Sequence, residues 1–344
     1  MSHTIQIQDH DIAFTCDENK SVLDGALAAG YDIPYSCRTG ICGSCRGRVV
    51  SGSVAGGQGA GLSEEEQAAG QVLLCQARAC SDLTVAVREV RKIDRSAIKT
   101  VTAKVYRMTR AAADVTVLQL RFPAGAKAKF KAGQYLSLKM EDGTVRHFSM
   151  ANPPHQNDGA ELHIRHVPGG KFSQHLAGQL AEGHQIEVSI PYGDFYVRDD
   201  SDKPIVLLAS GTGFAPIKSI VEDAIKRKLG RSMVLYWGAR RPEDLYRMDL
   251  ARKWETQLPW FRFVPVLSDA GAADGWEGRT GFVHQAVLDD IPSLAGHEVY
   301  ACGAPAMINA ARQAFVQQRQ LERDAFHCDA FVPAAAATTA ATSA

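Results

Sequence analysis

The spacing of apolar residues changes twice along the chain, which predicts three regions of different structure. In residues 1–92, alternating apolar and polar positions at 4–8 and 12–16 indicate two strands joined by a tight turn. From Ser21 to Gly30 the apolar positions follow helical spacing instead, with a capping residue at one end and glycine at the other. Further strand and turn patterns follow, so we expect one compact β-rich domain here.

The second region, residues 101–199, contains strand patterns almost exclusively. Short apolar runs separated by Gly, Pro and Asp turns occupy residues 101–109, 114–122, 134–140, 145–151, 161–167 and 185–191. One helix-like piece lies at 172–181, and a polar segment without periodicity at 93–100 indicates a linker before the region. Six short strands of this kind predict a closed antiparallel barrel.

In the third region, residues 200–333, strand and helix patterns alternate. The strand-like runs are 204–209, 232–238, 261–267 and 298–302, and the helical ones are 215–228, 249–257, 281–290 and 305–319. This alternation predicts a parallel α/β sheet covered on both faces. The low-complexity tail, residues 334–344, offers little to bury and is expected to be disordered.

Composition narrows the class of protein. The chain has 344 residues, with 38 basic and 38 acidic side chains, which argues against nucleic acid or an anionic membrane as the main partner. We find neither a secretory signal nor an apolar run of membrane-spanning length, and therefore expect a cytoplasmic protein. In that reducing compartment, the eight cysteines are expected to be metal ligands, catalytic groups or buried thiols rather than disulfides.

Three cysteines, Cys37, Cys42 and Cys45, follow the spacing C-x4-C-x2-C, and Cys75 comes 29 residues later. This is the spacing of plant-type [2Fe-2S] ligands. A zinc site is the alternative, but Cys42 and Cys45 form the only C-x2-C pair, whereas zinc sites favour two. Cys80 is a rival for the fourth ligand; we expect it, like Cys16, to be an ordinary buried or partly buried thiol.

The barrel region carries a candidate diphosphate site. Arg146, Phe148 and Ser149 lie on or just after a predicted strand, and Gly169-Gly170 precedes a helical turn that begins near Ser173. An arginine combined with a glycine-led helix N-terminus suits a diphosphate, because amides and guanidinium both donate to the anion. Each half of the pattern alone is more often a simple turn, but together they favour a flavin.

The α/β region begins with a strand, a glycine loop and a helix, in the order Gly211-x-Gly213-x-x-Pro216. Amides of such a loop bind a pyrophosphate, although proline departs from the usual third glycine. Arg240 and Arg241 follow the second strand; they either favour a 2′-phosphate or are solvated surface charges, so NADH and NADPH both stay open. Cys302 and Gly303 end a later strand, and Asp329 and Phe331 lie near the C-terminus.

Taken in this order, the segments resemble the fused plant-type ferredoxin and ferredoxin-NADP-reductase-like electron-transfer reductase components of bacterial aromatic-ring dioxygenases. The resemblance covers nearly all of residues 1–333 and rests on the cysteine spacing, Arg146-x-Phe-Ser, Gly169-Gly170-x-x-Ser173, Gly211-Thr-Gly-Phe-Ala-Pro216 and Cys302-Gly-x-Pro305. It implies a multidomain α+β and α/β protein with a β-grasp ferredoxin domain, a six-stranded antiparallel FAD-binding barrel and a parallel nucleotide-binding domain.

The resemblance also implies site residues. The implied [2Fe-2S] ligands are Cys37, Cys42, Cys45 and Cys75. The implied FAD-binding residues are Arg146, His147, Phe148, Ser149, His163, Arg165, Val167, Gly169, Gly170, Lys171, Phe172, Ser173 and Phe331. The implied NAD(P)H-binding residues are Gly211, Thr212, Gly213, Pro216, Gly238, Arg240, Arg241, Cys302, Gly303 and Pro305. Ser149 and Cys302 are the implied catalytic residues. The family usually has tyrosine where this chain has Phe148, which removes one hydroxyl.

The activity implied is a relay from NAD(P)H through FAD and the cluster to a Rieske-type oxygenase of aromatic hydrocarbon catabolism, with the terephthalate type most similar. The oxygenase is expected to dock near Arg38, Thr39 and Ile41, on a monomeric reductase. Two alternatives keep the relay and change the acceptor, to a diiron monooxygenase or a deoxysugar dehydratase. A more remote alternative is a redox sensor.

Overall fold

The computed structural model describes residues 1–93, 98–167, 170 and 180–332. The chain divides into two compact units, Met1–Ala97 and Ile98–Ala344. The helix-like piece expected at 172–181 lies, as far as residue 179, outside the described residues, and so does the tail expected at 334–344. In the described part, no helix combines the length and apolar character needed to cross a membrane.

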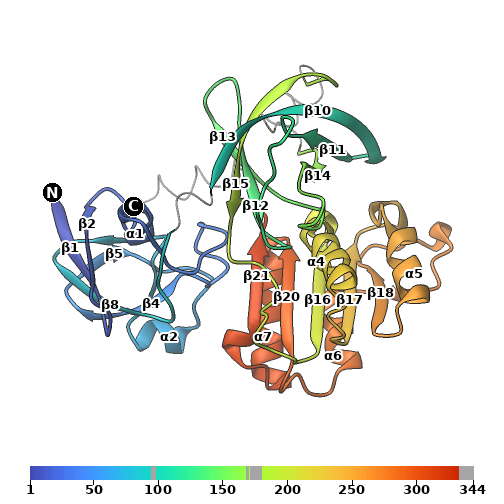
Figure 1. The fold of residues 1–344 in the computed structure, drawn as a ribbon. Helices are drawn as coiled ribbons and strands as arrows, with labels where there is room; N and C mark the ends of the chain where they lie inside the picture. Colours follow the sequence, from blue (N-terminus) through green and yellow to red (C-terminus); the bar gives the residue numbers. More distant parts are fainter. Residues whose placement is uncertain (94–97, 168–169, 171–179, 333–344) are drawn as a thin grey trace. The chain divides into compact units, whose positions relative to one another are not determined.

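The first unit is a mixed five-stranded sheet with one main helix (Figure 1). Its sheet has the order β2-β1-β8-β4-β6, with β1 parallel to β8. Its elements are β1 (Ser2–Ile7), β2 (Ile12–Asp17), α1 (Val22–Ala29), β3 (Tyr31–Asp32), β4 (Arg46–Ser51), β5 (Val54–Gly56), α2 (Glu64–Ala68), β6 (Gln71–Leu73), β7 (Ala77–Ala79), β8 (Leu83–Val87) and β9 (Arg91–Lys92). The expected β-rich domain is confirmed, and Ser21 caps α1 while Gly30 ends it with positive φ.

The second unit begins with the antiparallel barrel. All six strands expected from sequence are present: β10 (Lys99–Ala112), β11 (Val115–Arg121), β12 (Tyr135–Lys139), β13 (Val145–Ser149), β14 (Gly159–Arg165) and β15 (Gln185–Tyr192). They pair in the order β13-β12-β15-β10-β11-β14. A bridge between Met150 and Leu162 joins the two edges, so the sheet closes around its apolar core.

A parallel six-stranded sheet of order β19-β18-β17-β16-β20-β21 forms the rest of the second unit (Figure 1). Its elements are β16 (Ile205–Ser210), η2 (Gly211–Gly213), α4 (Phe214–Arg227), β17 (Met233–Ala239), η3 (Pro242–Asp244), α5 (Met248–Gln257), β18 (Phe261–Leu267), η4 (Ala272–Asp274), β19 (Arg279–Thr280), α6 (Val283–Asp290), β20 (Glu298–Gly303), α7 (Pro305–Arg319), η5 (Arg323–Ala325) and β21 (Phe326–Ala330). The four expected strands and four helices are confirmed; β19 and β21 are additions.

The strand order reverses beside β16, which positions the candidate site. The chain runs from β16 outward through β17 and β18 to the edge strand β19, and then returns to β20 on the other side of β16. Right-handed crossovers therefore place α4 and α5 on one face and α6 and α7, which pack together, on the other. Ligands of such sheets bind where neighbouring loops diverge at the carboxyl ends of the strands, here after β16 and β20.

Candidate functional site

The four cysteines expected to bind iron lie together in the first unit as two pairs of thiols. Cys37 hydrogen-bonds with Cys42, and Cys45 with Cys75. The backbone N–H groups of Thr39 and Cys42 also donate to Cys37 Sγ, at 3.4 and 3.3 Å. The contact with Cys42, followed by burial, raises the pKa of Cys37, so a bound cation is needed to keep it a thiolate.

The loop around these thiols fits a binuclear cluster. Gly40 and Gly43 have positive φ, and added Cβ atoms at Gly59 and Gly61 would lie 2.5 Å from Gly40 O and 2.8 Å from Gly43 N, so the backbone segments approach closely. The Thr39 side chain also interacts with Cys37, which lowers the pKa of that thiol. Four thiols in two pairs with amide and hydroxyl donors are the surroundings that an anionic [2Fe-2S] group requires.

Gln76 joins the two cysteine segments, a contact that the sequence analysis missed. Its side-chain amide donates to Arg38 O at 3.0 Å and lies 3.7 Å from Cys75 Sγ. The exposed Arg38 forms an ion pair with Asp24 and lies over the ring of Tyr35, 5.5 Å from its centroid. The sequence did not indicate this contact, because a glutamine after a cysteine does not by itself predict which groups it meets in the folded loop.

The remaining thiols of the first unit take no part in this cluster of cysteines. Cys16 is buried in the core, as expected, and an added Cβ at Gly25 would clash with its sulfur. Cys80 was expected to be at least partly buried, and this is wrong, because the residue is exposed where β7 ends. Cys75 rather than Cys80 is the fourth thiol of the set, since it contacts Cys45.

The barrel presents Arg146 as an available cation on β13. Among the described residues its guanidinium donates only to the carbonyl oxygen of neighbouring Val145, at 2.9 Å. It therefore retains donors for an anion such as a diphosphate. Phe148 packs against the barrel core, and exposed His147 pairs with Ser137 Oγ at 2.9 Å.

Where the barrel meets the parallel sheet, Ser149 Oγ donates to Asp329 Oδ2 at 3.3 Å, and both residues are buried. Asp329 lies opposite Cys302 in the pairing of β20 with β21. Burial, with the Asp329 charge, raises the pKa of the Cys302 thiol, which is therefore neutral. Phe331, half-buried, donates its N–H to Gly303 O at 2.8 Å. We call Ser149, Cys302 and Asp329 the candidate hydride-transfer face, or hydride-transfer face for short.

The glycine loop after β16 packs closely against neighbouring protein atoms. An added Cβ at Gly213 would lie 2.1 Å from Cys302 O, and one at Gly211, which has positive φ, would lie 2.8 Å from Arg165 Nη1. Arg165 also donates to Asp114 at 2.6 Å. Thr212 is buried, and Pro216 lies in the first turn of α4, as expected. These features fit a pyrophosphate at the N-terminus of α4.

The other expected nucleotide-binding residues surround this loop or the strand ends. Gly238 packs against Val283, leaving no room for a Cβ, and Pro305 opens α7. Arg241 lies 3.8 Å from both Asp269 and Asp274, whereas exposed Arg240 has no ion pair among the described residues.

Several expected flavin-binding residues either lie outside the described residues or contact protein. Gly169, Lys171, Phe172 and Ser173 belong to the first group. Gly170 donates its N–H to exposed Val167 O at 2.9 Å. Both ring nitrogens of buried His163 are engaged, by Glu161 at 3.0 Å and by the Tyr246 hydroxyl at 2.8 Å. His163 thus contacts the nucleotide-binding half rather than offering a free ring nitrogen to a flavin.

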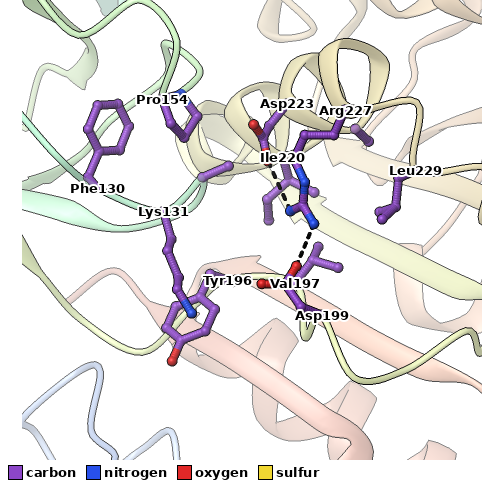
Figure 2. A pocket seen from close by; sticks show the side chains of 12 residues that line it. Phe130, Lys131, Pro154, Tyr196, Val197, Asp199, Ile220, Asp223, Arg227 and Leu229 are labelled. Atoms are coloured by element: carbon purple, nitrogen blue, oxygen red, sulfur yellow. Dashed lines mark hydrogen bonds and ion pairs between the residues drawn. The ribbon is translucent and has the colours of Figure 1, made fainter.

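A pocket of about 180 Å³ lies between the barrel and the far end of α4 (Figure 2). Arg227 pairs there with Asp199 at 2.5 Å and with Asp223 at 3.4 Å, and Lys131 Nζ lies 4.1 Å from the centroid of the Tyr196 ring. None of the expected site residues lines it. Its principal charges already have partners within the protein. None of Ser149, Cys302 and Asp329 lines it, so the pocket is separate from the hydride-transfer face.

Three family models match the chain in sequence order. They describe a 2Fe-2S iron-sulfur cluster binding domain at residues 5–80, an oxidoreductase FAD-binding domain at 102–196 and an oxidoreductase NAD-binding domain at 207–313. The three matches correspond to the unit with the cysteine pairs, the barrel and the parallel sheet.

Relatives match this chain over nearly their whole length. The reductase component 2 of terephthalate 1,2-dioxygenase from Comamonas sp. is 44% identical over 96% of this chain and 98% of its own length. The CDP-6-deoxy-L-threo-D-glycero-4-hexulose-3-dehydrase reductase of Yersinia pseudotuberculosis is 40% identical over 97% and 99%. Among solved structures, the Amycolatopsis cytochrome P450 reductase GcoB is 34% identical, with a TM-score of 0.74 over 96% and 99% of the two chains.

Proposed function

The chain belongs to the family of reductases that join a 2Fe-2S domain to FAD- and NAD-binding domains, and we propose that its electron acceptor is a Rieske-type aromatic-ring dioxygenase. It is an oxidoreductase with FAD and a [2Fe-2S] cluster as cofactors and a pyridine nucleotide as electron donor. When bound, FAD accepts a hydride from NAD(P)H, and the cluster carries its electrons onward singly.

The contact between Ser149 and Asp329 is the observation that carries the hydride-transfer part of the proposal. Asp329 orients the Ser149 hydroxyl at a buried place where barrel and parallel sheet meet. Cys302, as a neutral thiol, adds apolar volume that excludes water beside them. Gly211 and Gly213 let the loop before α4 pack closely against Arg165 and Cys302, and the pyrophosphate would bind at the N-terminus of this helix; Arg146 would supply a cation for the flavin diphosphate.

The choice of acceptor rests on the relatives. The terephthalate dioxygenase component is slightly more similar to this chain than the dehydrase reductase, at nearly equal coverage. The oxygenase would dock on the first unit where Arg38, Thr39 and Ile41 flank the cysteine pairs. Because Asp24 already neutralises Arg38, the docking contact would depend on shape and on half-buried Ile41 more than on charge. We further propose a monomer acting in the cytoplasm, where free thiols are kept reduced.

Reconstitution tests the choice of acceptor. The purified protein with NADH or NADPH is combined with a Rieske oxygenase of the terephthalate type, a diiron hydroxylase or a deoxyhexulose dehydrase. We expect product formation coupled to nucleotide oxidation with the Rieske oxygenase, and substantially slower turnover with the other two. Faster coupled turnover with the dehydrase or the diiron hydroxylase would reject the proposal. A redox sensor would give a single slow reduction and no sustained turnover with any acceptor.

A further inference from the structure

A cluster of buried and half-buried polar residues connects the flavin barrel to the nucleotide-binding half of the second unit. It consists of Glu161, His163, Lys218, Glu222 and Tyr246, and we call it the Glu161 network. Glu161 and His163 lie on β14 of the barrel, Lys218 and Glu222 on α4, and Tyr246 between β17 and α5. The contacts within this network therefore cross from the barrel to the nucleotide-binding half, or support a contact that does.

Lys218 has the most partners. Its ammonium lies 3.3 Å from Glu161 and 3.0 Å from Glu222, and it donates to the carbonyl oxygen of Ala151 in the barrel at 3.1 Å. Only 8% of Lys218 is exposed, so these three oxygens replace its water shell. The next residue, Ser219, adds a hydroxyl bond to Asn152 O at 2.7 Å. The first half of α4 is thus tied to the barrel.

His163 extends the network to the nucleotide loop. It donates from Nε2 to Glu161, so its Nδ1 accepts from the Tyr246 hydroxyl. The ring of Phe214 stacks near His163, with centroids 6.3 Å apart, and lies 4.0 Å from the ring of Trp237. The indole N–H of Trp237 donates to Gly211 O at 3.1 Å. A continuous series of contacts therefore runs from Glu161 to the glycine loop.

Ion pairs buried this deeply seldom add net stability over an apolar packing, because desolvating both charges offsets their attraction. Their geometry is nevertheless specific, since any displacement leaves a charge without its partner. We propose that Glu161, His163, Lys218 and Tyr246 are positioning residues, which hold the loop Gly211–Gly213 at the distance from the flavin that hydride transfer requires. The proposal rests on the NAD(P)H-to-FAD activity and not on the identity of the acceptor.

The test follows flavin reduction after rapid anaerobic mixing of the holoprotein with NADH, without any acceptor protein. Its observables are the limiting rate of flavin bleaching and the apparent Kd for NADH. For Lys218→Met we expect the limiting rate to fall about 10- to 100-fold, since a displacement near 1 Å suffices for this. The apparent Kd should change by less than about threefold, because the pyrophosphate contacts remain. Tyr246→Phe, which loses one hydroxyl, should slow the limiting rate by a few-fold.

Arg231→Met is the matched control. Arg231 and Glu298 form a pair at 2.7 Å that is even more deeply buried than that of Lys218 and Glu161, but both residues belong to the nucleotide-binding half. This variant should lose thermal stability and keep the wild-type limiting rate. The proposal is overturned if both network variants keep limiting rates within about twofold of wild type, or if the control slows as much as Lys218→Met. Should Lys218→Met fail to retain FAD, Tyr246→Phe decides by the same criterion.

Discussion

The two redox regions of this protein are built in opposite ways. Three of the four cluster thiols come from one loop, Cys37–Cys45, and Cys75 lies at the end of a neighbouring strand segment. The hydride-transfer face instead brings together Ser149, Cys302 and Asp329 from a barrel strand and two strands of the parallel sheet. The first site is a property of local sequence, whereas the second exists only after two halves of a unit have packed.

This difference predicts how each region responds to change. A substitution in the cysteine loop should remove one cofactor and leave the other half-reaction intact. A substitution at the hydride-transfer face should alter a rate while both cofactors remain bound, because the polypeptide contributes positioning there rather than ligation. Variants in the two regions should therefore separate the two responses.

Cys42→Ser should have the largest effect, since it removes a ligand that the chain cannot replace. We expect loss of the cluster's absorbance and paramagnetic resonance signal, and reduction of cytochrome c to fall by more than about a hundredfold. Oxidation of NAD(P)H by ferricyanide should stay near the wild-type rate. Cys80→Ser, at an exposed thiol, is the control and should change neither activity. Equal loss of both activities in Cys42→Ser would contradict the separation.

Asp329→Asn should slow flavin reduction without removing a cofactor. The amide keeps the size of the side chain but loses the negative charge of the carboxylate, which accepts the hydrogen bond from Ser149. We expect the limiting rate of flavin reduction by NADH to fall by about 10- to 100-fold, measured by stopped-flow absorbance. Reduction of the cluster by dithionite should be unchanged. Exposed Asp324→Asn serves as control, and an unchanged limiting rate in Asp329→Asn would remove this residue from the face.

His163 predicts a pH dependence of the second unit. Burial, opposed by the contact with Glu161, lowers the pKa of His163; Lys218 and Arg247 add to the lowering, and Tyr246 faces its other nitrogen. The unfolded chain, with a histidine pKa of about 6.5, then binds more protons than the folded chain. The stabilising contribution is therefore present above that pH and is lost as pH falls toward the folded pKa.

We expect this loss to lower the thermal midpoint of flavin release, followed by fluorescence, by about 2–4 °C for each kcal/mol lost. In His163→Phe the same decrease between pH 7.5 and 5.5 should be smaller, because the titrating group is gone. If the thermal midpoint falls equally between pH 7.5 and 5.5 in wild type and variant, His163 does not titrate in this range. His184→Phe, at an exposed histidine, is the control, and its thermal midpoint should fall with pH as much as that of wild type.

Gln76→Leu should have the smallest effect. It removes the amide donor 3.7 Å from Cys75 Sγ, and fewer donors make the more negative reduced cluster less stable. We expect the midpoint potential to fall by less than about 59 mV, which is tenfold in a one-electron equilibrium. Spectroelectrochemical titration measures this, with Gln67→Leu on α2 as control. A potential equal to that of wild type would mean that Gln76 only braces the loop.

The sequence was most informative where structure follows from neighbouring residues. The barrel strands were predicted because apolar residues alternate along them, and the cysteine spacing singled out the thiols because all but one lie on a single loop. β21 was missed although Phe326–Ala330 alternates apolar and polar residues, because the run is only five residues long and becomes a strand only by pairing with β20. Lys218 gave no signal, since a lysine within a helix normally faces water, and its partner Glu161 belongs to a barrel strand.

An anaerobic titration of the purified holoprotein with NADH or NADPH tests whether one chain links a pyridine nucleotide, a flavin and a [2Fe-2S] cluster. Absorbance follows the flavin, and electron paramagnetic resonance follows the reduced cluster. We predict uptake of about three electrons per chain, two for the flavin and one for the cluster, with the cluster signal appearing on addition of nucleotide alone. Flavin bleaching with no cluster signal, or a colourless protein that contains zinc and no labile sulfide, would contradict the account.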